Sequence, residues 1–209
     1  MRLQRAWMLP VILFLVAGLA GCGDESKSNV PVISQEEAVA EIEKLGGDVL
    51  FDEASPGRPL IAVALSGHEA TDASLEYLKG LTSLPSLTLS NTEVTDAGLE
   101  HLKGLTGLID LSISGTKVTD AGLVHLKGLT SLTELGLLGT EVTDAGLEHL
   151  KGLSGLESLN LIRTKVTDAG LEHLKGLTKL QRLFLRGTQV TDEGVRKLQE
   201  ALPNCEIEH

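Results

Sequence analysis

The dodecapeptide VTDAGLEHLKGL, residues 94–105, decides the fold of this chain. It returns at residue 118 with a single change, as VTDAGLVHLKGL, and unchanged at residues 142 and 166, so the segment recurs every 24 residues. A fixed period of this length predicts a solenoid, in which each unit buries its apolar face only by stacking on its neighbours. The repeated residues are therefore scaffold, and a localised function is expected where the copies differ.

Seven positions of the period are apolar in each of the five units that begin at residues 70, 94, 118, 142 and 166. In the second unit they are Val94, Leu99, Leu102, Leu105, Leu108, Leu111 and Ile113. The spacing of two that ends this series predicts a short strand, and the spacing of three from Leu99 to Leu102 predicts a short helix. We expect Thr95 and Asp96 to cap the start of that helix, and Gly104 to end it in a left-handed conformation.

The pattern L-x-x-L-x-L-x-x-T-x-V-T-D-x-G-L-x-x-L-x-x-L resembles the leucine-rich repeat family, closest to its helical, ribonuclease-inhibitor-like branch that is also seen in F-box-associated proteins and bacterial effectors. The resemblance covers about residues 60–207 and implies an α/β solenoid with parallel strands on a concave face, short helices on a convex face and an N-terminal helical cap. The family usually carries Asn or Cys where this chain carries Thr92 and its copies. We expect these hydroxyls to replace the family's Asn ladder by bonding the backbone of the neighbouring turn.

The repeats predict a division of the chain into caps and units. Residues 34–69 would form an N-terminal cap and a first strand, because Ser34 and Glu37 match a capping box. Residues 70–189 would form the five repeats, and residues 190–209 a C-terminal cap whose helix runs longer because Glu200 replaces the glycine of the other units. In the segment Leu202-x-x-Cys205-x-Ile207 we expect Cys205 to take the place of a core leucine, where a small buried hydrophobic residue is favoured over a reactive thiol.

The first 21 residues resemble the signal peptide of bacterial lipoproteins. Arg2 and Arg5 precede an apolar run, and Leu19-Ala20-Gly21-Cys22 resembles the lipobox. That resemblance implies that Cys22 is lipidated and becomes the first residue of an exported, membrane-anchored protein of the cell envelope, joined to the repeats by a tether over residues 22–33. The alternatives are an ordinary cleaved signal and an uncleaved anchor, and the choice of inner or outer membrane stays open.

The net charge of −11 disfavours nucleic acid and anionic lipid as partners, so attachment to a membrane would rest on the lipid. The sequence contains no nucleophile elbow, no paired Cys ligands and no phosphate-binding glycine loop. We therefore expect no enzyme and no cofactor.

Two columns of the repeat carry residue types that can bind metal ions. The aspartates could form a calcium ladder or cap helices, and capping is favoured because calcium needs roughly six to eight converging oxygens; they are Asp72, Asp96, Asp120, Asp144, Asp168 and Asp192. The histidines could bridge zinc or form a solvated face, and the solvated face is favoured because side chains on parallel helices do not converge; they are His101, His125, His149 and His173. We expect no metal.

The outward strand positions are where the repeats stop copying one another. They are small and polar in the first half, whereas the second half adds arginines to apolar side chains expected to be exposed, Leu138, Ile162 and Phe184. An aromatic between two arginines has the composition of a binding hot spot; the alternative is sequence drift. The candidate partner-binding residues are Asp110, Glu134, Leu138, Asn160, Ile162, Arg163, Arg182, Phe184 and Arg186.

These observations favour a lipid-anchored module of the cell envelope that binds an unknown protein or peptide through its concave sheet. A structural or adhesion spacer, or a binder of envelope polysaccharide, is the alternative, although few aromatic residues are present to stack on sugars. An adaptor of ubiquitin ligases, as in F-box repeat proteins, is disfavoured by the signal peptide and by the lack of a preceding F-box-sized helical segment. Oligomeric state stays open.

Overall fold

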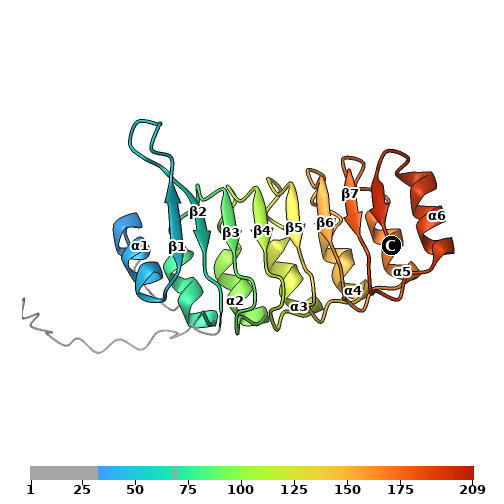
Figure 1. The fold of residues 1–209 in the computed structure, drawn as a ribbon, viewed down its shortest axis with the longest axis horizontal. Coiled ribbons are helices and arrows are strands. Elements are labelled where there is room, and N and C mark those ends of the chain that lie inside the picture. Colours follow the sequence, from blue (N-terminus) through green and yellow to red (C-terminus); the bar gives the residue numbers. More distant parts are fainter. Residues whose placement is uncertain (1–32, 68–69) are drawn as a thin grey trace, which may run out of the picture. The chain divides into compact units, whose positions relative to one another are not determined.

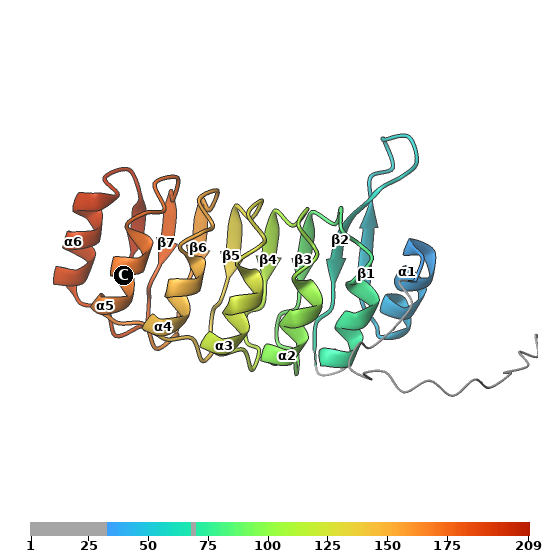
Figure 2. The ribbon, with the colours of Figure 1, turned by 180° about the vertical axis from the view of Figure 1, so that it is seen from behind.

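The computed structural model describes residues 33–67 and 70–209, which fall within one compact unit, Val32–His209. The predicted signal peptide and the predicted lipidation site Cys22 lie outside the described residues. Eight strands follow one another in chain order to form a single sheet (Figure 1). The first two strands are antiparallel and every later neighbour is parallel, with the helices on one side of the sheet (Figure 2). The predicted α/β solenoid is confirmed.

The strands are three to five residues long, because each repeat contributes only one alternating segment. They are β1 (Asp48–Phe51), β2 (Leu60–Ala64), β3 (Ser86–Thr88), β4 (Asp110–Ser112), β5 (Glu134–Gly136), β6 (Ser158–Asn160), β7 (Arg182–Phe184) and β8 (Glu206–Glu208). The register between successive parallel strands is 24 residues throughout, so equivalent residues lie side by side in rows. The central row is Val63, Leu87, Leu111, Leu135, Leu159, Leu183 and Ile207.

The helix of each repeat is one short α-helical segment continued by a 3₁₀ turn, except in the first repeat, which is 3₁₀ throughout. The segments are η1 (Asp72–Leu78), α2 (Asp96–Leu99) with η2 (Glu100–Leu102), α3 (Asp120–Leu123) with η3 (Val124–Leu126), α4 (Asp144–Leu147) with η4 (Glu148–Leu150), and α5 (Asp168–Leu171) with η5 (Glu172–Leu174). The flanking helices α1 (Gln35–Lys44) and α6 (Asp192–Ala201) are longer. None of the helices in the described ranges has the length and hydrophobicity needed to cross a membrane.

The seven apolar columns form one continuous core between sheet and helices. In the second unit all seven side chains have no measurable exposure, from Val94 to Ile113. Each buried Leu stabilises the fold by about 1.5–3 kcal/mol relative to an exposed one. Because every unit repeats the same columns, the core has no interruption from Val63 to Cys205.

The threonine column is buried with the core, but it does not form the predicted ladder between turns. The hydroxyl of Thr92 donates to the carbonyl of Leu89 in its own repeat at 2.8 Å, three residues back. Thr116, Thr140, Thr164 and Thr188 make the equivalent bond. The prediction was wrong because the hydroxyl is too short to leave its own turn, whereas a backbone carbonyl lies three residues away.

The aspartate column joins the repeats. Asp72 accepts two hydrogen bonds from Thr95 of the next repeat, one from its N–H and one from its hydroxyl, both at 2.7 Å. Thr95 in turn accepts from the Ala97 N–H and so caps its own helix. Four further pairs repeat this geometry: Asp96 with Thr119, Asp120 with Thr143, Asp144 with Thr167, and Asp168 with Thr191. The threonine therefore caps as predicted, whereas the aspartate holds the cap of the following helix rather than its own.

The predicted left-handed ending at Gly104 is also wrong. Its φ is not positive, and a Cβ added there would meet nothing within 4 Å. The left-handed residues stand instead just after the strands, in the column Gly67, Asn91, Gly115, Gly139, Arg163 and Gly187. The chain turns at these positions from the sheet towards the next helix, which requires a φ that glycine and asparagine adopt most readily.

The two ends of the unit differ from the repeats. Ser34 and Glu37 form the capping box that opens α1, and β1 adds an antiparallel edge strand. At the other end α6 spans ten residues, as the loss of the glycine at position 200 predicted. Cys205 is 3% exposed in the core, and burial raises the pKa of its thiol to about 11. This environment favours the buried-hydrophobe interpretation over a reactive thiol.

Candidate functional site

The candidate residues lie in three rows on the face of the sheet that points away from the helices. The first row passes through Asp110, Glu134 and Arg182, and the second through Asn160 and Phe184, as the strand register dictates. The third row follows just beyond the strands, where the backbone pairing continues. It contains Leu138, Ile162 and Arg186. Arg163 follows Ile162 in the chain and lines the same hollow as these three residues. We call the nine residues together the strand patch.

The first two rows of the strand patch border one shallow groove across β4 to β7. All five candidates of these rows line it: Asp110, Glu134, Asn160, Arg182 and Phe184. Glu134 on β5 and Arg182 on β7 form an ion pair at 3.3 Å across the intervening β6. Both side chains are about half exposed, 53% and 52%, so the pair contributes little to stability. The pair does, however, neutralise Arg182 within the protein, so this arginine is less available to a partner.

The third row borders a second shallow hollow, which we call the aliphatic hollow. It is lined by Leu138, Ile162, Arg163, Arg186 and Gly187. The two aliphatic side chains form its apolar part, and the two arginines lie at its side towards the end of the repeats. The nine candidates are thus divided between two adjoining surfaces of the same sheet face.

The candidate apolar residues were predicted to be exposed, and they are not. Leu138, Ile162 and Phe184 are partly buried, because neighbouring strands only about 4.8 Å apart cover much of each side chain. The large apolar side chains that are exposed lie elsewhere in the described residues: Leu50 at 57%, Ile109 at 48% and Val124 at 41%. The strand patch therefore offers a partly apolar floor rather than protruding anchors.

The two arginines of the aliphatic hollow have no ion-pair partner among the described residues, unlike Arg182. Arg163 also has a φ of +57°, the one arginine in a column otherwise made of glycine and asparagine. A left-handed conformation costs a residue with a side chain about 1–2 kcal/mol. The charge and the strain coincide at the same residue.

The N-terminal half of the sheet face satisfies its own polar groups. Ser86 donates to Asp110 at 3.1 Å, and the hydroxyls of Ser90 and Ser112 lie 3.1 Å apart. A further contact of 3.3 Å joins Ser112 to Ser114. Asp110 is the one candidate in this network, so its carboxylate is partly engaged by a neighbouring strand.

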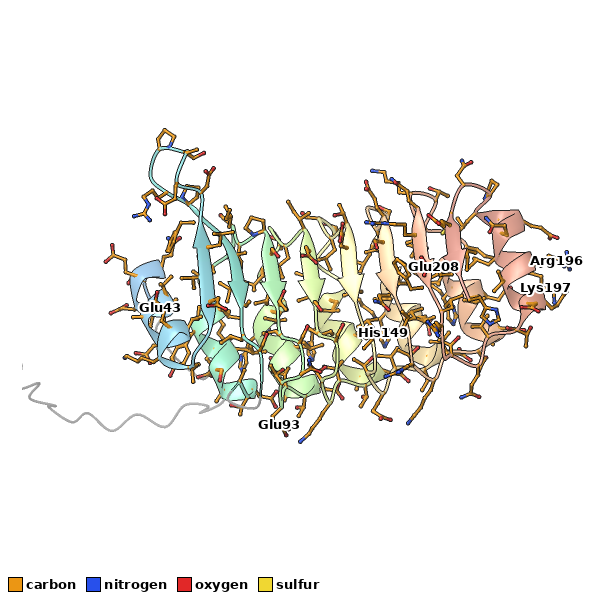
Figure 3. The ribbon with its side chains drawn as sticks, viewed as in Figure 1. Glu43, Glu93, His149, Arg196, Lys197 and Glu208 are labelled. Atoms are coloured by element: carbon orange, nitrogen blue, oxygen red, sulfur yellow. The ribbon has the colours of Figure 1, made fainter. Side chains whose placement is uncertain are left out.

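Sequence reasoning missed the contribution of β8. Glu206 and Glu208 continue the first and second rows beyond Arg182 and Phe184, and both are exposed. Figure 3 labels Glu208 on the last strand, next to β7. The 24-residue register extended from Arg182 would have predicted Glu206, but the C-terminal segment breaks the repeat pattern and hides that signal. The positive side of the patch is therefore limited to the third row.

The histidine column is partly buried rather than fully solvated. Burial lowers the pKa of His101, and nearby Lys79 lowers it further. His149, labelled in Figure 3, buries its Nδ1 without a hydrogen-bond partner among the described residues. Over those residues, no three side chains of His, Cys, Asp or Glu gather closely enough to hold a metal ion.

Comparison with known proteins identifies the repeat. A family model described as "Leucine Rich repeat" matches residues 176–198. A search of curated proteins found no match. Among solved structures, an internalin of Listeria monocytogenes is 28% identical over 64% of this chain and 36% of its own, with a TM-score of 0.56.

A second similar structure is a leucine-rich repeat protein of Leptospira interrogans. It is 23% identical over 64% of this chain and 33% of its own, with a TM-score of 0.52, which shows the fold alone. The aligned region spans roughly a third of the length of each of these two proteins. The rows of strands, the buried leucine columns and these similarities together show a leucine-rich repeat fold.

Proposed function

We propose that this protein is a non-enzymatic interaction module of the bacterial cell envelope, which binds a protein or peptide through the strand patch and is held at a membrane by lipid on Cys22. One observation carries the binding part: among the described residues Arg163 and Arg186 have no ion-pair partner, and they lie beside Leu138 and Ile162. Unpaired guanidinium groups next to a partly apolar floor are typical of interaction surfaces. They are conspicuous in a chain of net charge −11.

The fold supports the same class of function. Leucine-rich repeat proteins generally bind other proteins, and the internalin and the Leptospira protein share the architecture. Fold alone does not assign a function, so the proposed site is taken from the positions at which the repeats diverge. The sheet face holds that divergence, since its rows change from serine and threonine in β3 to arginine and phenylalanine in β7.

A capture experiment tests the binding part. Residues 24–209, which contain the whole compact unit, would be immobilised and exposed to envelope extract of a bacterium that expresses the gene. The variant Arg182→Ala/Phe184→Ala/Arg186→Ala removes one side chain from each row of the strand patch. We expect the native protein to retain a partner that this variant loses.

The matched control is the triple variant Ser86→Ala/Thr88→Ala/Ser90→Ala. These residues occupy the same three rows on β3, four repeats earlier, so they test the same face at its N-terminal half. Retention of the partner by this control and loss by the β7 variant would support the proposal. Equal retention by all three proteins would contradict it.

The lipid part rests on the sequence Leu19-Ala20-Gly21-Cys22 and is tested separately. Expressed in a bacterium, the native chain should enter the detergent phase after Triton X-114 partition and should incorporate labelled palmitate. Cys22→Ser should lose both properties. An unchanged partition of Cys22→Ser, with no label in the native chain, would contradict lipidation and would leave the binding proposal intact.

A further inference from the structure

The two arginines of the aliphatic hollow are held side by side by the backbone. The N–H of Arg163 donates to the carbonyl of Arg186 at 2.9 Å, so the two residues lie on neighbouring chain segments. A Cβ added to Gly187 would lie 3.3 Å from Cγ of Arg163, which shows that the Arg163 side chain lies close over the glycine. The absence of a side chain at Gly187, the residue after Arg186, thus leaves room for the Arg163 side chain.

The charge in this hollow has no counterpart in the described residues. Among the described residues, four Lys and Arg side chains form no ion pair. They are Lys127, Arg163, Lys179 and Arg186. Two of these four, Arg163 and Arg186, line the aliphatic hollow. Neighbouring cations repel each other, and a carboxylate placed between them would remove that repulsion and accept paired N–H bonds from the planar guanidinium groups.

The backbone at Arg163 supplies an independent indication. Five of the six residues in its column are glycine or asparagine, which adopt positive φ at little cost. Arg163 adopts the same conformation with a long side chain, at φ +57°. Strain of this kind is concentrated at binding and catalytic sites, where the side chain gives more than the backbone loses.

From these contacts we infer that the aliphatic hollow binds an acidic peptide segment, with a carboxylate between Arg163 and Arg186 and an adjacent aliphatic side chain on Leu138 and Ile162. This inference rests on the proposed function, since it names the chemistry of the partner. A protein segment combines carboxylates with aliphatic side chains in the way this surface does. A sugar would need aromatic stacking that the hollow does not offer, because no aromatic residue lines it.

The neighbouring charges give the bound segment a direction. Glu206 and Glu208 are exposed and continue the first and second rows, and Arg182 is already paired with Glu134. An acidic residue is therefore repelled from the β8 end of those rows and attracted to the third row. The carboxylate of the partner is expected over Arg186, and neutral or basic residues of the partner over Glu208.

The test uses a phage-displayed library of random dodecapeptides selected against immobilised residues 24–209. The selected peptides would be synthesised, labelled and titrated by fluorescence anisotropy at low and high salt. We expect enrichment of sequences that place Asp or Glu beside Leu, Ile or Val. The variant Arg163→Ala/Arg186→Ala should weaken their binding at least roughly 10-fold, and added salt should weaken binding to the native protein.

The matched control is Lys127→Ala/Lys179→Ala, which removes the other two unpaired cations and the same net charge. Its affinity for the selected peptides should stay within about twofold of that of the native protein, because neither lysine lines the aliphatic hollow. A general electrostatic effect would instead weaken binding in both variants alike. Equal weakening by both variants would overturn the inference. Melting temperatures of both variants, followed by circular dichroism, show whether each remains folded.

The remaining outcomes separate the inference from the proposed function. Peptides that lose affinity with Phe184→Ala but not with Arg163→Ala/Arg186→Ala would overturn the acidic site and support binding at the strand patch. A selection that yields no peptide dependent on either variant would overturn both. Arginine-dependent binding to phosphatidylglycerol vesicles without any peptide binder would also overturn both, because the partner would then be a lipid surface.

Discussion

Asp120 and Thr143, which are 23 residues apart, are joined by two hydrogen bonds: the N–H of Thr143 donates to Oδ1 at 2.7 Å and its hydroxyl to Oδ2 at 2.6 Å. The same hydroxyl accepts the N–H of Ala145 and caps α4. A single carboxylate thus fixes the position at which the helix of the next repeat begins. The stacking of repeats depends on this polar contact as well as on the leucine columns.

Asp120→Ala is expected to lower the free energy of unfolding by about 1–3 kcal/mol, because the Thr143 N–H loses its acceptor in a partly buried place. Urea denaturation followed by circular dichroism measures the loss. Asp192→Ala is the control, since Asp192 ends the column with a fully exposed carboxylate whose one ion-pair partner in the described residues is His209. A comparable loss in both variants would contradict a role for the contact between repeats.

Gly146→Ala is expected to destabilise the fold by roughly 1–3 kcal/mol, although alanine is the better helix former. A Cβ at this position would lie 2.4 Å from Oδ1 of Asp120, so the carboxylate would have to leave its bonds to Thr143. Gly152→Ala, where nothing lies within 4 Å, should be neutral or stabilising by up to about 1 kcal/mol. In urea unfolding, the free energy of unfolding of Gly146→Ala should be lower than that of the native protein, and that of Gly152→Ala should be equal to it or higher.

The pKa of Asp168 is expected below its ordinary value of 3.8, because the hydroxyl and then the N–H of Thr191 donate to its charged form. Thr191→Val removes the hydroxyl and should move the pKa back towards that value. An NMR pH titration of the Asp168 carboxyl carbon measures both. Since the folded pKa is lowered, the contact stabilises the protein above about pH 3.8, and that stabilisation is lost as the pH falls through the folded pKa. Identical titration curves would contradict the assignment.

Arg163→Gly is expected to stabilise the fold by about 1 kcal/mol, because glycine adopts the left-handed conformation without strain. The same change at Arg186, whose φ is not positive, should destabilise by roughly 0.5–1 kcal/mol. Urea denaturation separates the two. Affinity for acidic peptides should fall in both, so that Arg163→Gly gains stability while it loses binding. If Arg163→Gly neither gained stability nor lost affinity, the functional interpretation of the strain would be contradicted.

The sequence predicts the strands, the helices and the core because their apolar spacing has no competing interpretation. Leu111 and Ile113, two apart, can share one face only in a strand, and burial of both follows. The longer C-terminal helix also follows from one residue, Glu200 in place of glycine. These features depend on positions within a unit, which the sequence displays directly.

Contacts between units are not displayed in that way. An aspartate that capped its own helix and one that bound the next repeat would produce the same column, because every repeat has both residues. Asp120 and Thr143 are therefore assigned only by three-dimensional positions. The left-handed column could have been found, since Gly115 and Gly139 mark it, but Arg163 interrupts the pattern.

The sequence predicted which residues line the candidate site, but not how exposed they are or which of them form ion pairs. All nine residues line one of two adjoining surfaces, as their alternation in the strands required. Their exposure was not predictable, because the cover over Phe184 or Ile162 depends on neighbours in adjacent strands. The pairing of Arg182 with Glu134 likewise requires the register between β5 and β7. It leaves Arg163 and Arg186 as the arginines without an ion pair among the described residues.

Because successive units are joined by the same hydrogen bonds between aspartate and threonine, each unit can stack on any other in the same way. A further 24-residue unit inserted between the units that begin at residues 70 and 94 would offer its threonine to Asp72 on one side and its aspartate to Thr95 on the other. Each insertion would separate α1 from the strand patch by one more strand spacing, about 4.8 Å, and would leave both ends unchanged. The length of this protein can therefore change by whole units while the strand patch stays the same.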